Sequence, residues 1–183
     1  MHYLNSIYEM SEGLKMHLSG ILKKRTVAKK QYLLKTGHVC NSIYFIDKGL
    51  VRCFYLKEDK EVCSWFMKDG DVIVSVESFF TQRPSYEMIQ ALEDCTLYYI
   101  NYNELQYIYR NFTEFNFIGR VLTEKYYSLS EQRLFSLRMQ RAQERYEYLR
   151  EHDNELLLRV PSKYIASYLS ISEETLSRIR SKK

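Results

Sequence analysis

The chain has 183 residues, of which 45% are hydrophobic and 27% charged, as in a soluble globular protein with room for one sizeable domain and a smaller one. Its longest apolar runs are too short to cross a bilayer, and its N-terminus lacks the basic and apolar regions of a signal peptide. We therefore expect a cytoplasmic protein with no membrane partner.

The excess positive charge lies at the C-terminal end. Residues 1–132 contain 16 Lys and Arg and 16 Asp and Glu, whereas residues 133–183 contain 11 and 7, which accounts for the whole net charge of +4. This distribution suits a segment that binds phosphate groups, although it also fits a solvated basic face.

The N-terminal residues predict an amphipathic helical region with a break near Gly13. Its apolar residues recur at spacings of four and three: Tyr3, Ile7, Met10, Leu14 and Leu18. The basic stretch Lys23–Lys30 follows, and we interpret it as a solvated edge that leads into the first strand.

From Val27 to about Asn101 the pattern changes to short strands separated by turn residues. The predicted strands are 32–34, 43–46, 50–56, 61–67, 72–76, 86–92 and 96–100. Short strands at roughly eight- to twelve-residue intervals favour an antiparallel sandwich or jelly roll over a parallel sheet.

The periodicity then becomes helical, with a short helix over 102–110, a long one over 113–136 and another over 138–150. The long helix carries one apolar stripe: Phe115, Ile118, Leu122, Tyr126 and Leu129. Because Lys125 and Gln132 border this stripe, it is typical of a two-stranded seam. We expect a dimerisation face there, the alternative being a helix packed on its own barrel.

The stretch 160–183 predicts two short helices joined by a tight turn. The first would begin at Pro161, and the second would follow the N-cap Ser172. The outward-facing residues of the second helix would be Thr175, Arg178, Arg180 and Lys182. A short helix with Thr and Arg on one face fits a DNA major groove, where Arg reaches guanine O6 and N7. An ordinary helical hairpin that closes a core is the alternative.

Little in the sequence supports catalysis or metal binding. The cysteines at 40, 53, 63 and 95 form no C-x-x-C pair and lie in apolar, strand-like contexts. A cupin-type metalloenzyme would need two or three histidines inside the barrel, and only His38 lies in the strand region. We expect no metal, no cofactor and no enzymatic activity.

The order of these parts resembles the Crp/Fnr family of bacterial transcription regulators over essentially the whole chain. The resemblance is carried by Ile43–Arg52, by the KDGD turn Lys68–Asp71 and by Ser172–Ile179, which matches the family pattern S-x-E-T-[VL]-x-R. Segments similar to the Bacteroidetes-type branch of this family are Ser78–Phe80, Pro84-Ser85 and Ala91–Asp94.

The resemblance implies an α+β chain: an N-terminal helix with an antiparallel, cyclic-nucleotide-binding-like jelly-roll domain (1–112), a long dimerisation helix (113–137) and a small all-α helix-turn-helix DNA-binding domain (138–183). It implies a homodimeric transcription regulator that reads a pseudo-palindromic site in double-stranded DNA. An unknown small-molecule effector and RNA polymerase are further partners that it allows.

Two departures concern the effector. Family members that bind cyclic nucleotides hold the ribose with a Gly-Glu pair and the cyclic phosphate with Arg-Ser or Arg-Ala. Here those positions read Val74-Ser75 and Pro84-Ser85, and proline supplies no donor for a phosphate. Neither cyclic AMP nor cyclic GMP is therefore expected. The polar residues left as a candidate effector pocket, which could instead cap strands, are Ser75, Glu77, Ser78 and Ser85. Residues 1–39 also lack the cysteine cluster that Fnr-type oxygen sensing needs.

At the DNA end, Arg178 matches a family Arg and is the candidate for guanine readout, while Glu174 could accept from cytosine N4. Glu173 stands where the best-known members often have Arg, so a different operator is expected. Ser170 replaces the usual turn glycine and is expected to adopt a positive φ. The candidate DNA-binding residues are Ser162, Lys163, Ser172, Glu173, Glu174, Thr175, Arg178, Arg180 and Lys182, of which Ser162, Lys163, Arg180 and Lys182 would contact phosphates.

An effector- or partner-binding jelly-roll module without specific DNA readout remains the alternative function. Burial of Arg178 in an intramolecular salt bridge would favour it.

Overall fold

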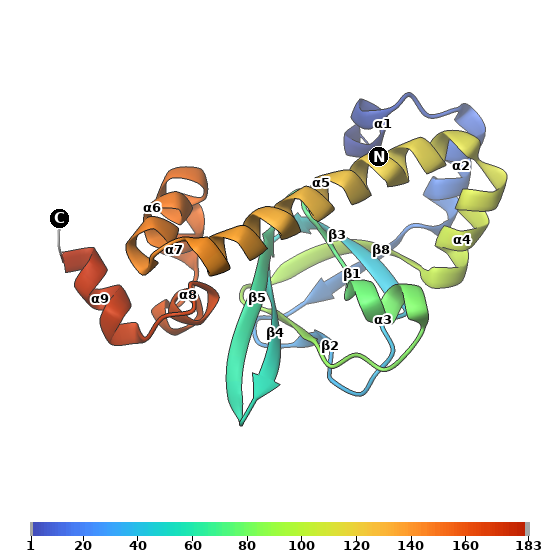
Figure 1. Cartoon of the computed structure of the whole chain (residues 1–183). Helices are drawn as coiled ribbons and strands as arrows, with labels where there is room; N and C mark the ends of the chain where they lie inside the picture. The colour runs from blue at the N-terminus through green and yellow to red at the C-terminus, as the bar shows by residue number, and fades with distance from the viewer. Residues whose placement is uncertain (1, 182–183) are drawn as a thin grey trace.

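The computed structural model describes residues 2–181 of the chain. Its strands are β1 (Lys23–Val27), β2 (Tyr32–Leu34), β3 (Ser42–Lys48), β4 (Leu50–Lys57), β5 (Lys60–Lys68), β6 (Val72–Ile73), β7 (Met88–Ala91) and β8 (Cys95–Asn101). They form two four-stranded antiparallel sheets, ordered β1-β8-β3-β6 and β2-β7-β4-β5, which face each other as a jelly roll (Figure 1). The expected jelly-roll fold is confirmed.

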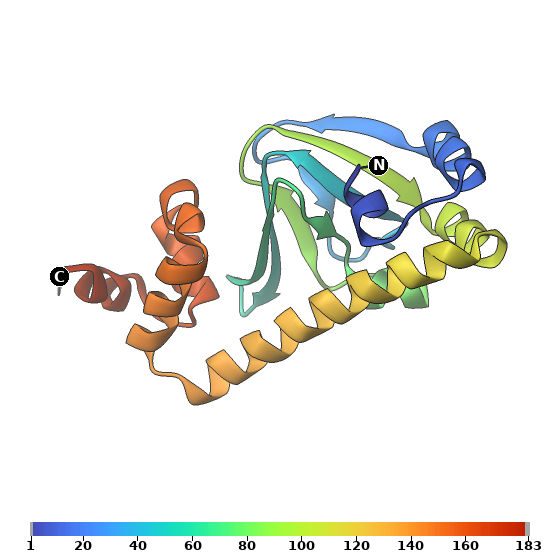
Figure 2. The ribbon, with the colours of Figure 1, turned by 90° about the horizontal axis from the view of Figure 1, so that it is seen from above.

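The helices lie at both ends of this barrel. They are α1 (His2–Ile7), α2 (Glu12–Ile21), α3 (Val76–Thr81), α4 (Tyr102–Asn111), α5 (Thr113–Met139), α6 (Ala142–His152), α7 (Asn154–Arg159), α8 (Ser162–Tyr168) and α9 (Glu173–Ser181). The long α5 runs beside the barrel from α1, α2 and α4 to the group α6–α9 at the opposite end (Figures 1 and 2). No helix within residues 2–181 has both the length and the apolarity needed to cross a membrane.

Several local expectations are wrong. The stretch 23–30 is a solvated edge as expected, but its first part is itself a strand, β1, rather than a lead into the first strand, and Lys23 pairs with Tyr99. Such an edge tolerates lysine because the ammonium group stays at the surface, and Lys23 Nζ lies 5.6 Å from the centroid of the Tyr99 ring. The strand predicted over 72–76 ends at Ile73, and α3 begins at Val76.

Helix boundaries also differ from the expected ones. The N-terminal break falls between Ile7 and Glu12 rather than at Gly13, because the Ser11 hydroxyl caps α2 by accepting from the Leu14 amide at 3.2 Å. The long helix continues to Met139, so the next one begins at residue 142 instead of 138. Pro161 is the N-cap of α8 rather than its first residue.

Two hydrophobic cores lie on opposite faces of β4, so apolar and polar residues do not simply alternate along this strand. Val51 and Cys53 belong to the core inside the barrel, whereas Leu50 and Phe54 belong to a second core shared with α6–α9. The strand is therefore buried on both faces. The ring centroids of Phe66 on β5 and Tyr168 on α8 are 5.2 Å apart. The C-terminal helices thus pack against the outer face of the β2-β7-β4-β5 sheet.

The apolar stripe of α5 mostly faces this chain's own barrel. Phe115 and Ile118 are buried in the core that the barrel shares with α2 and α4, Leu122 packs against it, and the Tyr126 hydroxyl accepts from the Val72 amide at 2.8 Å. Ile118 has no exposed surface and Phe115 only 6%, so in this structure neither offers the dimerisation surface that the stripe predicted. Of the predicted stripe, Leu129 remains 37% exposed. Other exposed apolar side chains on this helix are Phe117, Tyr127, Leu134, Phe135, Leu137 and Met139.

Candidate nucleic-acid interface and barrel site

The pair α8 and α9 is built around a tight turn. Ser170 has a φ of 53°, as expected for a residue in the position of a turn glycine, and the Ile171 amide donates to the Ala166 carbonyl at 3.0 Å. Ser172 begins the next helix as predicted, because its hydroxyl accepts from the Thr175 amide at 3.1 Å. Ile165 and Leu176 are completely or almost completely buried, so the two helices are fixed to each other and to the second core.

The outer face of α9 is polar and accessible. Glu173, Glu174 and Arg178 are exposed, whereas Thr175 is half-buried. The Arg178 Nη2 atom donates to the Thr175 hydroxyl at 3.1 Å, and within residues 2–181 the arginine forms no salt bridge. The Ser172 hydroxyl lowers the pKa of Glu174, which keeps this carboxylate ionised. The condition that would favour a module without DNA readout is therefore not met.

The candidate phosphate-binding residues lie on one surface formed by both helices. Arg180 Nη1 donates to the Ser162 hydroxyl at 2.8 Å, which joins the end of α9 to the start of α8. Lys163, the next residue, is exposed, and its Nζ lies 4.7 Å from the centroid of the Tyr164 ring. Lys182 lies outside the described residues.

Two arginines that the sequence interpretation missed hold the end of α8. Arg133 on α5 donates to the Tyr168 carbonyl at 2.7 Å, and Arg145 on α6 donates to the Leu169 carbonyl at 2.9 Å. Both satisfy carbonyls that a helix end leaves free. Burial lowers the pKa of Arg133, whose guanidinium carbon lies 3.5 Å from the centroid of the Tyr168 ring. Arg133 lies four residues, about one helical turn, after Leu129 of the predicted stripe, which was the signal available in the sequence.

The candidate effector residues in the barrel belong to separate hydrogen-bonded groups. Ser75 and Ser85 are buried with their Oγ atoms 3.0 Å apart, and Ser85 Oγ also bonds to the Glu87 backbone. The buried Ser78 hydroxyl lies elsewhere: it donates to the Arg83 carbonyl at 2.5 Å and accepts from the Cys40 amide at 2.9 Å. Glu77 is exposed on α3. The three serine hydroxyls are thus engaged in fixing the chain around α3.

A buried carboxyl group, which the sequence interpretation missed, lies next to these serines. Glu87 is only 8% exposed and accepts from the Ser64 hydroxyl at 3.1 Å. Burial raises the pKa of Glu87 more than its contacts with Ser75, Ser64 and Tyr55 lower it. An acidic group at this point disfavours an anionic ligand. A single acid inside the predicted strand 86–92 was the only sequence signal for it.

The described residues contain no group of three or more His, Cys, Asp or Glu side chains that could hold a metal ion. Cys40, Cys53, Cys63 and Cys95 are buried free thiols, and burial raises the pKa of each.

Comparisons with known proteins agree with the fold described above. Residues 24–112 match the family model of the cyclic nucleotide-binding domain. FixK2 from Bradyrhizobium japonicum is similar in structure, with a TM-score of 0.75, 19% identity, and coverage of 88% of this chain and 84% of that one. A putative transcriptional regulator of the Crp/Fnr family from Eubacterium rectale gives a TM-score of 0.76 at 16% identity, covering 98% and 86%.

A third similar structure is the c-di-GMP-responsive global regulator CLP of Xanthomonas campestris, with a TM-score of 0.72, 16% identity, and coverage of 94% and 91%. At these identities the likeness shows the fold. A search of curated proteins gave no significant match.

Proposed function

We propose that this chain, whose barrel matches the cyclic nucleotide-binding domain, is a homodimeric, sequence-specific DNA-binding transcription regulator of the Crp/Fnr type that does not respond to cyclic AMP. The observation that carries the proposal is the accessible polar face of α9, on which Arg178 is exposed. The structural likeness of 98% of this chain to a putative transcriptional regulator of the Crp/Fnr family supports the proposal.

In this proposal residues 1–112 are a sensor-like domain, 113–137 the dimerisation helix and 138–183 a helix-turn-helix domain. Arg178 reads guanine and Glu174 accepts from cytosine. Ser162, Lys163 and Arg180 contact phosphates, which fix register without reading sequence. Two copies of α9, about 34 Å apart in a dimer, would enter successive major grooves of a pseudo-palindromic site.

The dimer would use the part of α5 that the barrel leaves free. Tyr127 is 67% and Phe135 60% exposed, and both lie on the C-terminal half of the helix with Leu129 and Leu134. Exposed aromatic side chains on a long helix fit a two-helix interface, because pairing removes them from water.

The barrel site argues against a cyclic nucleotide as effector. The buried Glu87 supplies no positive charge for a cyclic phosphate, and Pro84 provides no donor. An effector of other chemistry would have to bind elsewhere or rearrange the serines, and its identity is not part of the proposal. RNA polymerase is a further partner that the family resemblance allows. The second candidate, an effector- or partner-binding module without DNA readout, would be favoured by an Arg178 buried in an intramolecular salt bridge, and Arg178 is exposed.

Selection from a random double-stranded DNA library tests the proposal. The wild-type protein should enrich a two-fold symmetric motif. Arg178→Ala should relax the preference at one base pair per half-site, a loss of about 1–3 kcal/mol of discrimination. Lys163→Ala should weaken binding to all sequences equally and reduce its salt dependence. No enriched motif for the wild type, with or without added cell extract as a source of effector, would overturn the proposal.

A further inference from the structure

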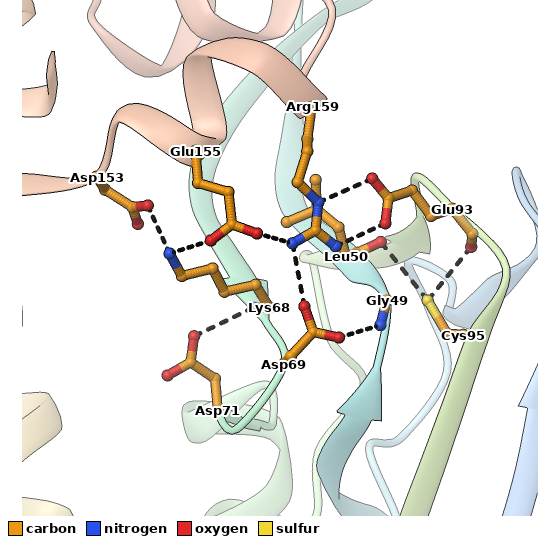
Figure 3. A network of polar contacts seen from close by, with 10 residues as sticks. All are labelled: Gly49, Leu50, Lys68, Asp69, Asp71, Glu93, Cys95, Asp153, Glu155 and Arg159. Atoms are coloured by element: carbon orange, nitrogen blue, oxygen red, sulfur yellow. Dashed lines mark hydrogen bonds and ion pairs between the residues drawn. The ribbon is translucent and has the colours of Figure 1, made fainter.

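One arginine of the C-terminal helices is held by carboxylates from two separate turns of the barrel. Arg159, at the end of α7, donates from Nε and Nη2 to the two carboxylate oxygens of Glu93 at 2.9 and 2.6 Å. Its Nη1 donates to Asp69 at 3.0 Å and to Glu155 one helical turn earlier. Figure 3 shows the guanidinium group surrounded by these three acids.

A second cation extends the cluster. Lys68 Nζ donates to Asp153 at 2.6 Å and to Glu155 at 2.9 Å (Figure 3). Within this group two cations therefore stand against four carboxylates. The cations are what keep the acids of the barrel and those of α7 together. Without Arg159, the carboxylates of Asp69, Glu93 and Glu155 would face one another and repel.

The barrel side of the cluster is fixed by the barrel's own contacts. The Asp69 carboxylate accepts from the Gly49 amide at 2.7 Å. Gly49 has a φ of 115°, and a Cβ at this position would lie 2.6 Å from Cys95 Sγ, so the turn is closely packed against β8. The Gly49 amide and Arg159 outweigh burial and lower the pKa of Asp69, while Lys68 and Arg159 lower that of Glu155. Both acids are thus ionised at neutral pH.

The position of Arg159 in the chain makes this contact decisive for the helices that follow. Only Val160 and Pro161 separate it from α8, and α9 is fixed to α8 through the second core. Between α5 and the C-terminal helices α6–α9 the chain has only two residues, Gln140 and Arg141, both with extended backbone angles. The ion-pair cluster is one tether. The others are the packing of α8 on β5, the stacking of Arg52 of β4 on Tyr164, and the hydrogen bond from Arg133 of α5 to the Tyr168 carbonyl.

We propose that Arg159 is a positioning residue that fixes α8 and α9 relative to the barrel, and so sets the half-site spacing that the dimer accepts. This inference rests on the proposed function. Arg159 itself faces the barrel and touches no base. Its loss should change how precisely the two recognition helices are spaced, while the bases that each helix prefers stay the same.

The first test separates spacing from base preference. A DNA library carries two partly randomised copies of the half-site selected by the wild type, joined by random spacers of varied length, so that it reports half-site and spacing together. The wild type should enrich one spacer length, and Arg159→Ala should enrich a broader set with an unchanged half-site. Arg178→Ala should keep the wild-type spacer length and change the preferred half-site. Arg110→Ala, an exposed arginine on α4 at the far end of the molecule, is the matched control and should behave as the wild type. An unchanged spacer distribution in Arg159→Ala would overturn the inference.

A second test needs no DNA. Spin labels on cysteines introduced at the exposed positions Lys57 and Ser177 report the distance between the β4–β5 hairpin and α9, with excess unlabelled protein added to suppress distances between subunits. Arg159→Ala should broaden this distance distribution at low salt, and 1 M salt should broaden that of the wild type because it screens the ion pairs. Thermal unfolding of each variant confirms that it is folded.

The two tests distinguish the two proposals. If the wild type selects no DNA motif, the proposed function fails, and the distance measurement alone decides whether Arg159 positions the helices. A narrow distribution that is identical in the wild type and in Arg159→Ala would refute the positioning role whatever the DNA result.

Discussion

The guanidinium carbon of Arg52 lies 3.8 Å from the centroid of the Tyr164 ring, which joins strand β4 of the barrel to helix α8. Arg52 is 1% exposed. It donates to both carboxylate oxygens of Glu61 at 2.7 and 2.8 Å and, from Nε and Nη2, to Gln90 at 3.0 and 2.7 Å. A buried arginine, hydrogen-bonded to side chains of the barrel and stacked on a ring of α8, therefore lies where the barrel meets the C-terminal helices.

Loss of this arginine should destabilise the whole chain. Arg52→Ala leaves Gln90 and Glu61 without their donor and opens a cavity beneath Tyr164, so we expect the free energy of unfolding to fall by about 3 kcal/mol. Tyr164→Leu, which removes only the stacked ring, should cost about 1 kcal/mol. Urea denaturation measures both. The exposed control Arg110→Ala should change stability by less than about 0.5 kcal/mol, and a similar small effect for Arg52→Ala would contradict the prediction.

Gly49 should not tolerate a side chain. A Cβ there would meet Cys95 Sγ at 2.6 Å and the Cys95 Cα at 2.9 Å, and the φ of 115° is itself unfavourable for other residues. Gly49→Ala should therefore lower the free energy of unfolding by about 2 kcal/mol or more. At Gly20 on α2, a Cβ would meet no other part of the described chain within 4 Å, so Gly20→Ala should be neutral or stabilising by up to about 1 kcal/mol. Equal effects of the two substitutions in thermal denaturation would be inconsistent with this difference.

Ser170 carries backbone strain that glycine would relieve. It is exposed and has a φ of 53°, a conformation that costs L-residues about 1 kcal/mol. Ser170→Gly should raise the free energy of unfolding by about 0.5 kcal/mol after the greater entropy of an unfolded glycine is subtracted, whereas Ser170→Val should lower it. Chemical denaturation of both variants gives the sign. A destabilised glycine variant would show that the serine hydroxyl has a role that its contacts do not reveal.

Glu87 should make the protein less stable as pH rises. Burial raises the pKa of its carboxyl group, so the folded chain binds this proton more tightly than the unfolded chain does. The contribution of Glu87 to the free energy of unfolding therefore falls as pH rises from the ordinary glutamate pKa of about 4.3 through the raised folded value. Glu87→Gln can keep the contact with Ser64 and does not titrate. Its stability relative to the wild type should increase between about pH 4 and pH 7, and a constant difference across this range would contradict the buried ionisable group.

The exposed end of α5 should control association. Phe135→Glu places a charge on a side chain that is 60% exposed, and it should shift the protein from dimer to monomer if this surface pairs. Met16→Glu, at a side chain that is 75% exposed on α2, is the control and should leave the mass unchanged. Sedimentation equilibrium measures both. If Phe135→Glu remains a dimer, the interface does not lie on this part of the helix.

The local chemistry of the sequence was sufficient for much of the fold. The short strands, the long helix and the Ser172 cap were predictable because periodicity and capping depend on residues within one or two turns of each other. The positive φ of Ser170 was predictable from its match to a turn position. The edge strand at Lys23–Val27 was not predictable, because its lysines are typical of an exposed segment and its partner strand, β8, is far away in the sequence.

Which surface each element buries was decided only by the tertiary structure. The sequence showed that α5 has an apolar stripe, but not that Phe115 and Ile118 would be buried in the core that this chain's own barrel shares with α2 and α4. Arg159 binds Glu93 and Asp69 across 66 and 90 residues of chain, and Arg52 meets a ring on α8. No local pattern encodes such contacts. They form because folding brings charged side chains from separate turns into a partly buried space, where each needs a partner of opposite charge.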